Sequence, residues 1–282
     1  MLLLAATQRG WPVARRGSQS IADALANVIT EHGGAIECNR RVRSLDELPR
    51  SRAVLLDVSA RQLADIAGAR LPASYARRLL RFRHGVGSLK VDYILSEPVP
   101  WTADACRRAG TVHVGGSMLD IAAAEATVSD GAVTQRPFVL VGQPTLVDPS
   151  RAPGGETVLW AYCHVPQGRD LTAQHDEIVG YLEARIEEYA PGFRDTIVAR
   201  HVMGPTELEA HNPNLHGGDI AIGSAEGLQL LFRPMLRVDP YRTPADGIYL
   251  CSAATPPGGG VHGMCGWNAA GSALRHTLRD LA

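Results

Sequence analysis

The chain has 282 residues, and its 28 Lys and Arg nearly balance its 29 Asp and Glu, which gives a formal net charge of −1 at pH 7. Hydrophobic residues make up 45% and charged residues 20%, so the composition excludes an intrinsically disordered chain. The balanced charge gives no indication of nucleic-acid binding. Five scattered cysteines, none at Cys-x-x-Cys spacing, indicate free thiols in a reducing compartment, and we expect a cytoplasmic protein.

The first third of the chain alternates helical and extended patterns. Apolar residues repeat at a helical spacing from Ile21 to Ile29, and Gly33 ends that helix. Ser59 and Gln62 have the spacing of a capping box and begin another helix. We expect helices over residues 20–32, 59–68 and 74–82, and extended segments near residue 36 and over residues 41–43, 53–58 and 89–95.

The middle third repeats these patterns in a different order. Ser117 begins a helix with Asp120 in its first turn, where a negative charge is favourable. We expect strands over residues 111–114, 138–141, 157–163 and 197–202, and a long helix over residues 173–189. A mixed sheet with helices on its face predicts the α/β or α+β class.

The last third contains the most informative feature of the sequence. Residues 206–241 form no long periodic segment, and a loop of that length in a compact protein is functional or disordered. A buried strand over residues 247–254 is followed by the glycine-rich residues 255–266 and an Ala-rich helix. Glycines let backbone amides approach a flat or anionic ligand, and a helix N-terminus adds partial positive charge. The alternative is a tight strand-to-helix turn without a ligand.

Weaker patterns suggest other sites. Cys265 near His262 at a helix start would be a nucleophile if exposed, and otherwise is a small buried side chain. No G-x-S-x-G motif supports an α/β-hydrolase. A basic cluster could contact phosphate or a membrane surface, or form a solvated helix face; it comprises Arg77, Arg78, Arg81, Arg83 and His84. Four loop residues could ligate a metal, but their spacing fits no standard site and we assign none; they are His201, His211, His216 and Asp219.

The glycine-rich segment resembles a known family. Residues 247–263 are similar to the C-terminal flavin-binding segment of the phytoene desaturase-related FAD-dependent oxidoreductases, within the wider NAD(P)/FAD-dependent oxidoreductases. Residues 16–21, 137–155, 189–193 and 217–220 resemble other stretches of the family in the same order. The resemblance implies a partial FAD-binding domain of the flavin amine oxidase and phytoene desaturase type, formed by residues 1–70 and 240–282, and a mixed-sheet substrate domain over residues 71–239.

The resemblance also implies a set of FAD-binding positions. Residues 258–264 would line the flavin ring and ribityl chain, and Val42 would place its backbone against the adenine. Ser252 and Pro256 stand where related sequences often have Gly and His, and Arg16 precedes Gly17 where the family often has a second glycine. The complete set of cofactor-binding candidates is Val42, Ser252, Ala253, Gly258, Gly259, Gly260, Val261, His262, Gly263 and Met264.

One family element is not found in this sequence. The family holds the FAD pyrophosphate with an N-terminal βαβ unit carrying G-x-G-x-x-G, and no such motif opens the chain. Residues 1–6 lack the features of a signal peptide and resemble the end of a helix. We therefore expect the C-terminal portion of a longer oxidoreductase, arising by truncation or from a split gene. A partner chain could then supply the βαβ unit, and the surface left uncovered predicts self-association.

The resemblance implies hydride transfer from an apolar, isoprenoid-like substrate to flavin, with peripheral membrane contact because related substrates are lipophilic. Catalytic residues are not assigned, because the cofactor carries the chemistry. Apolar strand positions suggest Trp160, Tyr162 and Phe232 as pocket residues. The alternative is a noncatalytic remnant or binding subunit with an oxidoreductase-like substrate domain.

Overall fold

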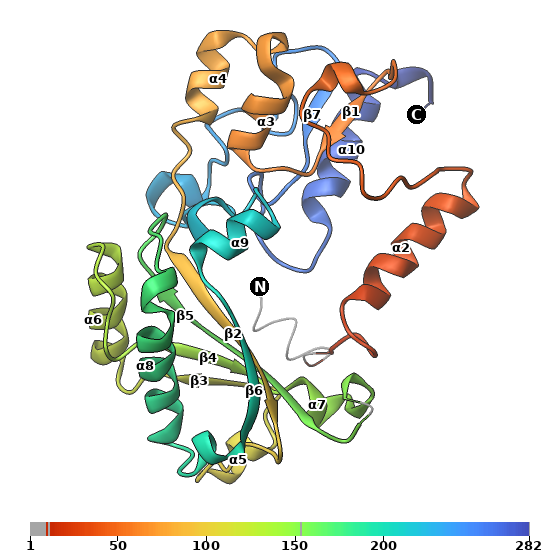
Figure 1. The fold of residues 1–282 in the computed structure, drawn as a ribbon. Helices are drawn as coiled ribbons and strands as arrows, with labels where there is room; N and C mark the ends of the chain where they lie inside the picture. Colours follow the sequence, from red (N-terminus) through yellow and green to blue (C-terminus); the bar gives the residue numbers. More distant parts are fainter. Residues whose placement is uncertain (1–9, 11, 153, 282) are drawn as a thin grey trace.

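The fold is described from a computed structural model, which covers residues 10, 12–152 and 154–281. It contains one sheet of five strands and one sheet of two strands, each with its own helices (Figure 1). The predicted start at residues 1–6 lies outside the described residues. Among the described residues, no helix is both long and apolar enough to cross a bilayer.

The five-stranded sheet is antiparallel throughout, in the order β3-β4-β5-β2-β6. Its two long strands, β2 and β5, alternate between fully buried and partly exposed residues, so one face is in the core and the other is only half covered. The strands are β2 (Gly87–Leu95), β3 (Thr111–Val114), β4 (Val139–Gly142), β5 (Thr157–Val165) and β6 (Ile197–Met203).

Helix α8 (His175–Glu187) covers the buried face of this sheet. Its apolar residues Ile178, Val179, Leu182 and Ile186 are at most 2% exposed and belong to the same core as the inward residues of β2 and β5. Helix α6 (Met118–Ser129) begins with a capping box, in which the Ser117 side chain and the Asp120 side chain each bind the other residue's backbone N–H.

The smaller sheet pairs β1 (Val54–Leu56) with β7 (Ile248–Leu250) in parallel, although nearly 200 residues of sequence separate the two strands. Helices α3 (Ala60–Ala67) and α4 (Ala73–Leu79) pack on it and form a second core. Helix α10 (Met264–His276) follows β7 along the chain. The core residues include Leu56, Leu63, Leu79, Phe82 and Leu250.

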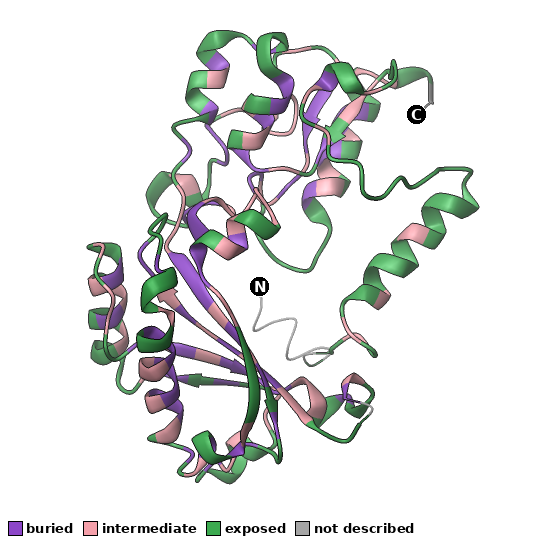
Figure 2. Ribbon diagram, in the orientation of Figure 1, coloured by how far each residue is buried: buried purple, intermediate pink, exposed green. Residues whose placement is uncertain are grey.

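Helix α2 (Gln19–Glu31) packs far less closely than the other long helices. It has no buried residue, and its apolar residues Ile21, Leu25, Val28 and Ile29 are between 41% and 63% exposed. Figure 2 shows it as an almost continuously exposed segment that stands apart from both sheets. The remaining helices are α5 (Asp104–Arg107), α7 (Pro144–Val147) and α9 (Pro205–His211), and short 3-10 turns join several elements.

The predicted α/β or α+β class is confirmed, with both parallel and antiparallel pairing present. The strand over residues 111–114 has the predicted bounds. The predicted strand at residues 41–43 is wrong, because that segment has no regular structure and no sheet partner among the described residues. The strand predicted over residues 247–254 is only three residues long, because Ser252 leaves the extended conformation and begins a turn. The domain limits at residues 70 and 240 stay a prediction; the second core also takes in Leu71, Tyr75 and Leu79.

Candidate functional site

The glycine-rich turn joins β7 to α10 at the carboxyl ends of the two parallel strands. Ser252 is 1% exposed, and its hydroxyl donates a hydrogen bond of 2.6 Å to the carbonyl of Val58, just after β1. The Ala254 amide donates to the same hydroxyl. This bond ties the two strand ends together at the edge of a parallel sheet where ligands of α/β proteins bind.

Within the turn, three glycines adopt a backbone conformation that other residues rarely take. Gly258, Gly260 and Gly263 have φ angles of +98°, +145° and +64°. Gly258 is buried, whereas the residues from Gly259 to Met264 are exposed, so their backbone borders open space. Gly263 forms the left-handed N-cap of α10, which directs the start of a 13-residue helix toward the turn. This arrangement is a backbone cradle with positive potential at one end.

Arg233 lies directly beneath this turn, and the sequence analysis did not single it out. It is 4% exposed, and its guanidinium donates 2.7 Å to the carbonyl of Ile222 and stacks 5.5 Å from the centre of the Phe82 ring. A Cβ atom at Gly258 would lie 3.5 Å from Arg233 Nη1. Burial lowers the pKa of Arg233, while the nearby Asp219 charge opposes that shift. Its Nε has no hydrogen-bond partner among the described residues.

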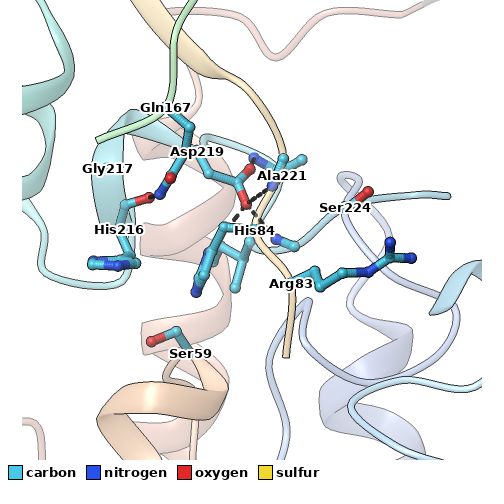
Figure 3. A network of polar contacts seen from close by, with 12 residues as sticks. Ser59, Arg83, His84, Gln167, His216, Gly217, Asp219, Ala221 and Ser224 are labelled. Atoms are coloured by element: carbon cyan, nitrogen blue, oxygen red, sulfur yellow. Dashed lines mark hydrogen bonds and ion pairs between the residues drawn. The ribbon is translucent and has the colours of Figure 1, made fainter. Parts of the chain in front are cut away.

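Asp219 fixes its own loop at Ala221 and joins it to His84 (Figure 3). Its carboxylate accepts hydrogen bonds from the amides of Gly85, Ala221 and Gly223, at 2.6 to 2.9 Å, and is 3.2 Å from His84 Nδ1. Burial alone would raise the pKa of Asp219, but these donors outweigh it and the pKa lies below its usual value. An ionised carboxylate is therefore fixed beside the buried Arg233, and the two opposite charges stabilise each other.

The half-covered face of the large sheet carries two of the predicted pocket residues. The rings of Trp160 and Tyr162 on β5 stack with centroids 6.3 Å apart and an interplanar angle of 9°. Gly142 on β4 leaves room for the Trp160 ring, because a Cβ there would overlap it. Phe232 belongs to the loop after the short 3-10 turn at residues 227–230, outside this sheet, and is 39% exposed.

The other residues predicted to bind the cofactor differ in how far they are buried. Val42 is half-buried against the second core, and Ala253 is half-buried in the turn. Val261 and His262 are exposed, and the Met264 amide donates to His262 Nδ1 at 3.0 Å. Whether these residues contact a cofactor stays a prediction.

Two other sites considered from the sequence were a nucleophilic cysteine and a metal centre. Cys265 is 7% exposed and its thiol points back at the carbonyls of Thr255 and Gly258, as expected of a packed side chain. Within the described part of the chain, no group of three or more His, Cys, Asp or Glu side chains is arranged to hold a metal ion.

Comparison with known proteins places these features in context. No protein-family model matches the chain. It is 26% identical to the rat pyridine nucleotide-disulfide oxidoreductase domain-containing protein 2, over 93% of this chain and 51% of that protein. It is also 26% identical to the neurosporene-forming phytoene desaturase of Rhodobacter capsulatus, over 89% of this chain and 51% of that protein. The chain thus spans about half the length of the curated relatives it matches.

A solved structure agrees with these relatives at the level of fold. An oxidoreductase from Methanosarcina mazei matches 93% of this chain and 54% of its own, with a TM-score of 0.59 at 15% sequence identity. The shared fold therefore covers most of this chain.

Proposed function

We propose that this chain, a distant relative of phytoene desaturases and of pyridine nucleotide-disulfide oxidoreductase domain proteins, forms the flavin-facing turn and substrate sheet of an FAD-dependent oxidoreductase. The observation that carries the proposal is the exposed glycine cradle above the buried, incompletely hydrogen-bonded Arg233. Such a cradle admits the edge of a flat ring, and a side chain at these glycines would occupy the same space.

The residues fit a flavin in chemical terms. Bound FAD would accept the hydride removed from the substrate. Backbone amides from Gly258 to Met264 and the start of α10 would bind its pyrimidine end, and the Arg233 charge would stabilise negative charge developing on the ring. The face bearing Trp160 and Tyr162 would bind an apolar substrate by excluding water from it. An isoprenoid-like substrate rests on the phytoene desaturases among the relatives.

The pyrophosphate of FAD requires a second group of contacts. The sequence contains no G-x-G-x-x-G motif at the start of a βαβ unit. In addition, β1 is an edge strand of only three residues in the two-stranded sheet, and its Leu55 is 39% exposed. We therefore propose that a βαβ unit outside these 282 residues, from further sequence or a partner chain, binds the pyrophosphate and extends this sheet.

A matched pair of glycine variants tests the proposed cradle. Gly263 and Gly192 both sit at left-handed helix caps, at φ/ψ of +64°/3° and +89°/4°, and a Cβ at either would meet no atom within 4 Å. Asn tolerates this conformation, so both Gly→Asn variants should fold equally well. We expect Gly263→Asn to weaken riboflavin and FAD binding about tenfold or more, and Gly192→Asn to leave it unchanged.

Fluorescence quenching of added flavin measures this difference, with circular dichroism as the folding control. Equal affinities for the two variants would contradict a flavin cradle at the turn. If neither the wild-type chain nor a version completed by a βαβ unit quenched flavin fluorescence, the noncatalytic binding subunit would be the better description.

A further inference from the structure

A cavity lies between the helices that pack on the two-stranded sheet and the segments that follow β5 and α9. The flavin proposal makes no use of this cavity. Its volume is about 220 Å³. Segments far apart in the sequence form its wall, namely α3, the end of α4 with the following residues, the loop after β5, and the turn after α9. Its polar lining consists of Arg61, His84, Gln167 and His216, and its apolar lining of Leu79, Leu80 and Phe82.

Two imidazoles in this cavity are each held by a carboxylate at Nδ1. His84 Nδ1 is 3.2 Å from Asp219, and His216 Nδ1 is 2.9 Å from Glu209. The rings contact each other edge to face, with centroids 4.8 Å apart (Figure 3). A carboxylate at Nδ1 fixes a proton on that nitrogen and leaves Nε2 free for a ligand. Nε2 accepts a hydrogen bond in the neutral ring and donates one to an oxyanion when the ring takes up a second proton. Neither Nε2 has a hydrogen-bond partner among the described residues.

Both carboxylates are kept ionised by their surroundings. The donors around Asp219 are described above. Burial would raise the pKa of Glu209, but the hydrogen bonds from His216 and the Gly217 amide, and the charges of His216 and Arg61, lower it overall.

The backbone that follows His216 packs unusually closely against neighbouring segments. Gly217 has a φ of +62°, and a Cβ there would lie 2.1 Å from Gln167 Nε2 and 2.8 Å from the Gly168 amide nitrogen. Gly218 has a φ of +83°, and a Cβ there would lie 2.7 Å from Pro205 Cα. Two successive glycines in the left-handed region thus permit the close backbone packing that accompanies His216 in the cavity lining.

The charge of the lining selects the ligand. No carboxylate lines the cavity, because Asp219 and Glu209 stand behind the imidazoles, whereas the Arg61 guanidinium lies on its wall. Arg61 is the second residue of α3, an eight-residue helix whose N-terminus adds partial positive charge. Arg61 forms no hydrogen bond or ion pair with another side chain in the described ranges. A cation would be repelled by Arg61, while an oxyanion would find donors on two sides.

We propose that this cavity is a binding site for a small oxyanion, a carboxylate or phosphate group, held by Arg61 and by Nε2 of His84 and His216. The apolar wall at Leu79, Leu80 and Phe82 admits either a free anion or the anionic end of a longer apolar molecule. The site needs no flavin.

The test is calorimetric titration of the full chain, without flavin, with inorganic phosphate, acetate and octanoate at constant ionic strength. We expect at least one of them to bind saturably below about 10 mM. Arg61→Gln, His84→Gln and His216→Gln should each weaken that binding about tenfold or more, because each removes a charged hydrogen bond. Arg50→Gln and His201→Gln, at exposed positions outside the cavity, serve as matched controls and should leave binding unchanged.

The relative affinities of the probes distinguish the two kinds of anionic ligand. Equal binding of acetate and octanoate would support a free anion, and tighter octanoate binding would support the end of an apolar molecule. Absence of saturable binding by all three probes would overturn the proposal. It would also be overturned if Arg61→Gln, which changes an exposed side chain and should fold normally, bound the anions as well as Arg50→Gln does. Binding of Zn²⁺ at His84 and His216 without binding of the anions would overturn it as well. None of these results bears on flavin binding, which is measured separately.

Discussion

The two sheets of this molecule differ in how completely they bury their apolar residues. Around the five-stranded sheet, the inward residues of β2 and β5 and the facing side of α8 are nearly all inaccessible to solvent. Around the two-stranded sheet, the core is smaller, Leu55 of β1 is 39% exposed, and α2 has no buried residue. The glycine-rich turn proposed to face flavin belongs to the less completely buried region.

The region that is most completely buried is therefore not the region proposed to bind flavin. The large sheet can be stabilised by its own contacts, because antiparallel neighbours and one helix bury its inner face. The small sheet brings together the groups proposed to bind flavin, but three-residue strands provide few backbone hydrogen bonds of their own. We infer that the part of the molecule proposed to bind flavin depends on contacts beyond those that stabilise the five-stranded sheet.

The largest expected effect is a loss of stability in the large sheet. Leu182 on α8 is 0% exposed, and Leu182→Ala should lower the free energy of unfolding by about 2–5 kcal/mol through lost burial and a cavity. Leu25→Ala on α2, where the side chain is 63% exposed, should change it by less than about 0.5 kcal/mol. Urea denaturation of both variants measures the contrast. Similar losses for the two leucines would mean that α2 packs as tightly as α8.

A smaller effect is expected at Asp219, which links the two regions. At pH 7, Asp219→Asn should lower the free energy of unfolding by about 1.5–3 kcal/mol, because charged hydrogen bonds are lost. The folded pKa of Asp219 lies below its unfolded value, since the surrounding donors outweigh burial. Its stabilisation is therefore present above about pH 4 and is lost as the pH falls through the folded pKa.

The measurement is urea denaturation from pH 7 to pH 3, and the gap between wild type and Asp219→Asn should narrow at the acidic end. Asp65→Asn, at an exposed position on α3, is the control and should lie within about 0.5 kcal/mol of wild type throughout. A gap that stayed constant with pH would contradict an ionised, hydrogen-bonded Asp219.

The same division explains what could be predicted from the sequence. The strand over residues 111–114 and the helix beginning at Ser117 were predictable because local alternation and capping determine them. The glycine-rich connection between a strand and a helix was predictable from its composition, and its role as a ligand site stays a prediction. The pairing of His84 with Asp219 and His216, and the packing of Arg233 on Phe82, were not predictable, because each of these contacts joins residues more than 130 positions apart. The prediction of a strand around Val42 is wrong, and in the part of the chain that the structure describes no strand pairs with this segment.

The smallest expected effect on folding concerns the exposed face of α2. Leu25→Glu with Ile29→Glu should leave the free energy of unfolding within about 0.5 kcal/mol of wild type, yet reduce self-association of the chain. Asn27→Glu, which adds charge at another exposed position of α2, is the control and should leave association unchanged. Sedimentation velocity at tens of micromolar protein measures this. A wild-type chain that is monomeric under these conditions would contradict an uncovered apolar surface.

The most direct test of the account compares riboflavin with FAD on the wild-type 282-residue chain. If the chain holds only the isoalloxazine end, through the turn at Gly258 to Met264, then riboflavin should bind saturably. FAD should bind no more than about tenfold tighter, because contacts to its pyrophosphate come from elsewhere. Flavin fluorescence titration gives both dissociation constants. FAD binding about a thousandfold tighter than riboflavin would contradict the account, because this chain would then contain its own pyrophosphate site.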